Sequence, residues 1–114
     1  MKHKGYEGTV EFSEEDNILH GVIIGIVDVV SYEGASVDEL RQDFELAVDD
    51  YLVLCEKIGK EPNKPYKGSF NVRMGEKIHR RASAIARKHG QTLNYFVTNA
   101  TKKAIEENEA RARA

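Results

Sequence analysis

The sequence contains no tryptophan, one cysteine and two prolines among its 114 residues. The single cysteine, Cys55, excludes an intrachain disulfide and is typical of proteins in a reducing compartment. The most apolar run, Gly21–Val27, is far shorter than the roughly 20 residues that a membrane-spanning helix needs. Met1 is followed by polar residues and not by the apolar segment of a secretory signal. We therefore expect a cytoplasmic protein without membrane association.

Motifs for catalysis and metal binding are also scarce. Cys55 lies on an apolar stripe at helical spacing, which favours a buried thiol over a nucleophile. The histidines have no zinc-ligand spacing with this cysteine; they are His3, His20, His79 and His89. Several carboxylates leave open a Mg²⁺-dependent nuclease but are explained more simply as outer faces of a strand and a helix. These are Glu7, Glu11, Asp49 and Asp50. We expect no enzyme activity, no catalytic residue, no cofactor and no metal.

The charge that is present is divided between two halves of the chain. Residues 1–68 carry 7 Lys and Arg against 15 Asp and Glu, a net charge of −8. Residues 69–114 carry 10 against 4, a net charge of +6. A basic segment suits nucleic acid, and an acidic one suits a basic protein. The asymmetry therefore favours two surfaces with two partners of opposite charge, although two merely solvated halves would look the same.

The acidic half has the pattern of a small α+β domain. Apolar residues alternate over 6–12, and two further short apolar segments, 18–24 and 28–33, follow across turns, which predicts a three-stranded antiparallel sheet. Ser36 and Glu39 form a capping box before a long amphipathic helix that ends at Gly59. The apolar stripe of this helix must cover the sheet, because neither element buries its apolar face alone. We assign residues 1–60 to this domain and residues 61–68 to a proline-containing linker.

The basic half, residues 69–114, has the element order of a ribbon-helix-helix domain. One alternating strand spans 69–74, a helix spans 76–89, and a second helix runs from Thr92 to about residue 108. The strand has no partner within its half, so we expect it to pair with the same strand of a second chain. The resulting homodimer would bury an apolar core of Phe70, Val72, Met74, Ile78, Ile85, Phe96 and Val97.

A two-stranded ribbon of this kind fits the DNA major groove. Arg73 can bond a guanine and Asn71 an adenine, while Ser69 can bond either kind of base edge. Free amides at the start of the second helix can bind a phosphate. The expected DNA-binding residues are Ser69, Asn71, Arg73, Thr92, Leu93 and Asn94. A dimerisation module that does not bind DNA is the simpler alternative.

Several segments in this order resemble the HicB antitoxins. They are Tyr6–Asp16, Gly25–Val30, Ala47–Leu52 and Pro65–Arg73, and the turn Gly90–Asn94 is similar to that between the helices of ribbon-helix-helix repressors. The resemblance implies an N-terminal domain with a partial RNase H-like fold. It also implies binding and neutralisation of a HicA-type toxin that cleaves mRNA, and repression of the operon through double-stranded DNA. Dimers of dimers are common in the family, which extends the expectation to a tetramer.

Toxin contacts are expected among acidic and neighbouring residues near the strand ends, because a basic toxin is attracted to an acidic surface. They are Glu14, Glu15, Asp16, Asp28, Tyr32 and Glu33. Two alternatives remain open. The chain can be a ribbon-helix-helix repressor whose N-terminal domain senses a ligand or protein and which has no toxin, or it can be the metal-dependent nuclease considered above.

Overall fold

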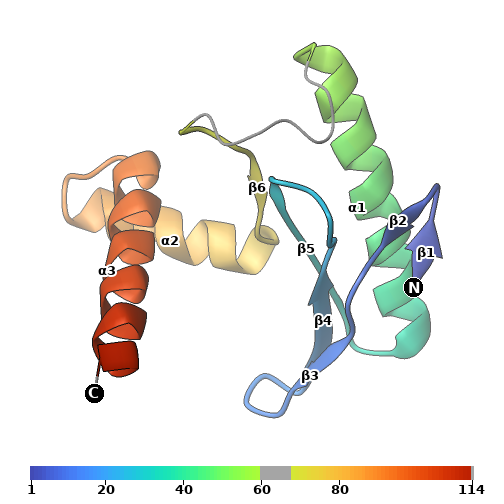
Figure 1. Ribbon diagram of the computed structural model, residues 1–114, viewed down its shortest axis with the longest axis horizontal. Helices are drawn as coiled ribbons and strands as arrows, with labels where there is room; N and C mark the ends of the chain where they lie inside the picture. The colour runs from blue at the N-terminus through green and yellow to red at the C-terminus, as the bar shows by residue number, and fades with distance from the viewer. Residues whose placement is uncertain (60–67, 114) are drawn as a thin grey trace. The chain divides into compact units, whose positions relative to one another are not determined.

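The computed structural model describes residues 1–59 and 68–113 and forms two compact units, residues 1–75 and residues 76–114 (Figure 1). The first unit combines strands with one long helix, and the second consists of two helices. The α+β class predicted from the sequence is therefore confirmed. Among the described residues, no helix is long and apolar enough to cross a lipid bilayer.

The first unit contains a hairpin and a separate four-stranded sheet. The hairpin consists of β1 (Lys2–His3) and β2 (Tyr6–Glu7), and the sheet of β3 (Glu11–Ser13), β4 (Ile18–Val22), β5 (Val29–Gly34) and β6 (Val72–Arg73), in that order. Strands β3, β4 and β5 are antiparallel neighbours, whereas β6 joins β5 in parallel. The sheet thus has one strand more than expected, and that strand comes from the segment predicted to pair with a second chain.

The first predicted strand is divided into β2 and β3 because a tyrosine interrupts its ladder. A bridge between Gly8 and Ile23 keeps the register in which β3 pairs with β4. The Tyr32 hydroxyl donates to the Thr9 carbonyl at 2.7 Å. The Val22 amide instead donates to the Thr9 side-chain Oγ1 at 2.9 Å. A side-chain hydroxyl therefore replaces one backbone acceptor at this point of the sheet.

Two glycines make room for the Tyr32 hydroxyl. A Cβ on Gly8 would collide with the Tyr32 hydroxyl and with the Phe44 ring. A Cβ on Gly21 would collide with the Thr9 carbonyl. The Tyr32 and Phe44 rings meet edge to face, with centroids 5.1 Å apart. Glycine at these two positions lets the strands approach the aromatic pair closely.

Helix α1 (Val37–Lys57) covers the sheet as the sequence predicts (Figure 1). The Ser36 Oγ accepts from the Glu39 amide at 3.2 Å, and the Glu39 carboxylate accepts from the Ala35 amide at 2.8 Å. Its buried stripe consists of Leu40, Phe44, Ala47, Val48, Tyr51 and Cys55, which pack with Ile23, Val30 and Tyr32. Burial contributes roughly 1.5–3 kcal/mol for each large apolar side chain, so this core stabilises the unit.

The second unit is a pair of helices, α2 (Glu76–Lys88) and α3 (Leu93–Arg113). Gly90, with φ of 66°, ends α2 in a Schellman motif, because the Gln91 amide donates to the Ala86 carbonyl at 2.9 Å. The Thr92 Oγ1 caps α3 by accepting from the Tyr95 amide at 3.0 Å. Both helices start where the sequence predicts, and α3 continues further toward the C-terminus than expected.

Candidate functional site

The segment expected to contact DNA lies at the edge of the sheet in the first unit. In the parallel ladder, Val72 pairs with Val29 and Arg73 pairs with Val30. The Val29 amide donates to the Asn71 carbonyl at 3.0 Å. The strand is short, and β5 satisfies part of its backbone.

Just before this ladder, a buried carboxylate holds the chain. The Asn71 amide donates to the Asp28 Oδ1 at 2.9 Å, and Asp28 is only 3% exposed. A bond to a carboxylate is stronger than one between neutral groups. Asp28 therefore fixes the entry of β6 into the sheet.

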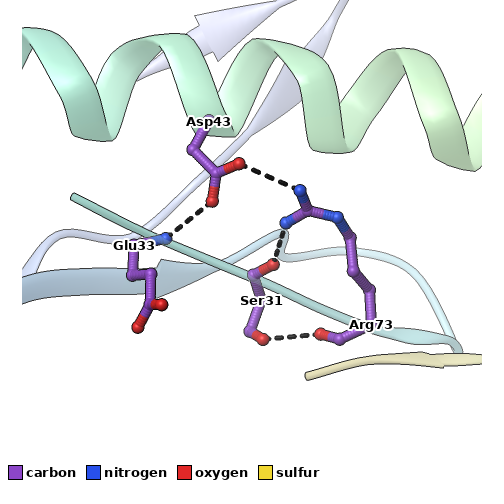
Figure 2. Close-up of polar contacts among 4 residues, drawn as sticks. All are labelled: Ser31, Glu33, Asp43 and Arg73. Atoms are coloured by element: carbon purple, nitrogen blue, oxygen red, sulfur yellow. Dashed lines mark hydrogen bonds and ion pairs between the residues drawn. The ribbon is translucent and has the colours of Figure 1, made fainter. Parts of the chain in front are cut away.

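The Arg73 side chain is held by α1 and by β5 (Figure 2). Its Nη2 donates to the Asp43 Oδ1 at 2.9 Å, and its Nη1 donates to the Ser31 carbonyl at 2.6 Å. The Ser31 hydroxyl donates in return to the Arg73 carbonyl at 2.5 Å. The second Asp43 oxygen accepts from the Glu33 amide at 2.9 Å. One carboxylate thus joins α1 to both β5 and β6.

This geometry differs from the solvent-facing arrangement that the sequence suggested for the predicted base contacts. Arg73 and Asn71 are half-buried, and both line a pocket of about 320 Å³ against α1. Ser69 alone among the three is exposed. The reason is the parallel register, since Arg73 shares its face with the core residue Val30.

The sequence analysis did not identify Asp43 as the partner of Arg73. The available signal was its spacing. Asp43 lies three residues after Leu40 and four before Ala47, which are both buried, so it borders the apolar stripe. A carboxylate at such a border can reach a cation on the neighbouring sheet.

The predicted toxin contacts are divided between surface and core. Glu14, Glu15 and Asp16 are exposed in the turn between β3 and β4, and Glu33 is exposed on β5. Asp28 and Tyr32 are 3% and 2% exposed, respectively. Their expected place on the surface is therefore wrong in this fold. Asp28 binds the backbone of Asn71, and Tyr32 binds the carbonyl of Thr9.

The second unit exposes part of its predicted core. Only Ala82 and Ala86 are buried in its described residues. Ile78 and Ile85 are 49% and 45% exposed. Phe70 and Val72, near the end of the first unit, are exposed as well. Met74, Phe96 and Val97 are half-buried. Two helices with two buried alanines bury little apolar surface of their own and leave apolar side chains exposed.

The predicted phosphate contacts lie at the start of α3. Thr92 and Asn94 are exposed, and Leu93 is half-buried. The Thr92 Oγ1 is used for capping, as described above, and leaves other first-turn amides without an intrahelical partner. The basic residues around them include Arg87 and Lys88 in the last turn of α2.

A cluster of charges fastens the β1–β2 hairpin to α1. Asp49 Oδ1 lies 2.9 Å from both the Lys4 Nζ and the His3 Nε2. The hydrogen bond from Lys4, and then that from His3, lowers the pKa of the Asp49 carboxyl. In the described parts of the chain, no three His, Cys, Asp or Glu side chains are placed to hold a metal ion.

Residues 51–100 match the family model of the HicB family. The matched stretch begins in the second half of α1 and ends within α3, so it includes β6 and α2. The match supports the resemblance to this family found in the sequence. No curated protein and no solved structure matches the chain.

Proposed function

We propose that this chain is a HicB-family antitoxin that neutralises a HicA-type toxin and represses its own operon. The match of residues 51–100 to the family carries the proposal and indicates an antitoxin of a toxin–antitoxin system. The division of charge, a net −8 over residues 1–68 and +6 over residues 69–114, also supports the proposal. We also propose that the chain has no enzyme activity of its own.

In this proposal the second unit and the segment around β6 form a ribbon-helix-helix dimer. The exposed Ile78 and Ile85 support a second copy, because two chains together can bury what one leaves in water. The capped start of α3 supports phosphate binding. The first unit offers the exposed carboxylates Glu14, Glu15 and Asp16 to a basic toxin.

Toxin neutralisation is tested by growth. Cells expressing the small basic protein encoded beside this chain should stop growing, and co-expression of the chain should restore growth. Replacing Glu14, Glu15 and Asp16 together by Gln, Gln and Asn should weaken the restoration, whereas the same charge change at Asp38, Glu56 and Glu106 should not. Unrestored growth despite retained DNA binding would favour the repressor without a toxin.

DNA binding is tested with Arg73→Ala on duplex DNA from the region upstream of the chain's own gene. Loss of a bidentate base contact should weaken binding by about 1–3 kcal/mol, or roughly 5- to 150-fold. Arg41→Ala is the matched control, because Arg41 is exposed on α1 and carries the same charge. An equal loss of DNA affinity in both variants would show a merely electrostatic effect. In the growth assay, the chain with Arg73→Ala should still restore growth.

A further inference from the structure

Arg73, the expected guanine contact of the β6 segment, points toward α1. Two residues that pair across adjacent strands lie on the same face of the sheet. Arg73 pairs with the buried Val30 in this way. Asn71 and Arg73 both line the pocket that Ala47 and Tyr51 of α1 also line. DNA cannot enter between a sheet and the helix packed on it.

The face of β6, rather than its edge, decides whether it can contact DNA. A strand has two edges, so pairing with β5 leaves one edge for a second copy of the chain. The Arg73 guanidinium, however, has a single position at a time. It is bonded either to Asp43 and Ser31, as Figure 2 shows, or to a base. Base contact therefore requires that Arg73 leave its partners on the first unit.

We propose that the first unit holds β6 in an autoinhibited state, here called the docked state, in which Asp43 and Ser31 sequester Arg73 and restrict DNA binding. This regulation rests on the proposed function, since it concerns the same DNA-contacting segment. The docked state is the arrangement of Asp28, Ser31 and Asp43 around residues 71–73 described above.

The ends of the docked segment suit a reversible movement. Gly68 and Gly75 lie on either side of β6 with φ of 88° and 87°. Glycine adopts positive and negative φ values at little cost. The chain can therefore change direction at both ends of the β6 segment. The docking contacts are mainly polar, and the apolar Phe70 and Val72 remain about half exposed. Release therefore sacrifices little apolar burial.

Asp43→Asn tests the docked state. The variant removes the ion pair with Arg73 but keeps a side-chain oxygen that can accept from the Glu33 amide. Only undocked molecules can bind DNA, so the apparent DNA affinity falls as the docked fraction rises. Weakening the docking should therefore increase the apparent DNA affinity. We expect about fivefold tighter binding to duplex DNA from upstream of the gene, since a partly buried ion pair is worth roughly that factor. Glu56→Gln on the exposed end of α1 has the same effect on net charge and should leave affinity unchanged.

A reversible covalent lock provides the second measurement. Val29 and Val72 are paired in register and are 43% and 40% exposed, so Val29→Cys with Val72→Cys places two thiols within reach of a disulfide. The native Cys55 is buried and does not compete. Oxidation to the intrachain disulfide, verified by mass under non-reducing conditions, should weaken DNA binding at least tenfold. Reduction should restore it.

The outcomes separate the regulation from the proposed function. Tighter binding by Asp43→Asn together with weak binding by the oxidised double variant supports the docked state. DNA binding that is equal for the wild type, Asp43→Asn and the oxidised double variant overturns the docked state and leaves the proposed repressor intact. Absence of DNA binding by every form, including Asp43→Asn, overturns the proposed DNA function and the regulation with it.

Discussion

At the scale of single residues, Tyr32 organises the sheet of the first unit. Its hydroxyl lies 2.7 Å from the Thr9 carbonyl and 3.2 Å from the Val22 carbonyl, so it ties β5 to the end of β4 and to the segment before β3. Burial raises the pKa of this phenol, and the bond to Thr9 opposes that effect. The hydroxyl therefore remains a donor throughout the neutral range.

Tyr32→Phe should lower the free energy of unfolding by about 1–2 kcal/mol, because it removes a buried donor and leaves two carbonyls with one partner fewer. Urea denaturation followed by far-ultraviolet circular dichroism measures the change. Tyr95→Phe is the matched control, since Tyr95 is 56% exposed on α3. A change in Tyr32→Phe no larger than that of the control would contradict the role given to the phenol.

Asp49 should make the attachment of the β1–β2 hairpin depend on pH. Its pKa in the folded protein is lowered by Lys4 and then by His3, so the ionised carboxylate adds stability above the ordinary carboxyl pKa of about 4. That stability is lost as the pH falls through the lowered folded value. Hydrogen exchange of the Gly8 amide, which donates to the Met1 carbonyl, reports on the hairpin. Asp49→Asn should reduce amide protection at neutral pH and remove the acid dependence; an unchanged profile would argue against this attachment.

At the scale of elements, local signals made the helices predictable. Helix α1 follows from a capping box, an apolar stripe and a terminal glycine, all within one continuous segment. Helix α3 likewise starts after the cap Thr92. The docking of β6 was not predictable in this way. It joins Val29 to Val72, more than 40 positions apart, and depends on the carboxylates of Asp28 and Asp43, whose partners no local pattern in the sequence indicates.

Strand β4 depends on a glycine for its close contact with the segment before β3. Gly21→Ala should destabilise the first unit by about 2 kcal/mol or more, because its Cβ would overlap the backbone carbonyl of Thr9 and the chain would have to shift. Val22→Ala, at the exposed neighbouring position, should cost less. Thermal unfolding of the two variants makes the comparison, and a Gly21→Ala protein as stable as the wild type would disprove the close approach.

At the scale of the whole molecule, the second unit should be completed by a second copy. Ile85→Glu places a charge on its exposed apolar surface and should shift the chain toward the monomer by at least tenfold in dissociation constant, since a buried unpaired charge is costly. Sedimentation equilibrium measures the shift. Val37→Glu, at a 60% exposed position in the first turn of α1, adds the same charge and should leave association unchanged. A monomeric wild type would contradict the dimer proposal.

The small core of α2 and α3 has a consequence for turnover. Segments that bury little apolar surface open locally at low free-energy cost, and a protease cleaves what is open. With two alanines buried, the C-terminal helices should be digested before the sheet and α1. Because a partner that binds only the folded form suppresses opening by mass action, the lifetime of these helices should lengthen as the chain becomes more abundant. When the concentration of the chain falls, the C-terminal helices should therefore be degraded sooner than the sheet and α1.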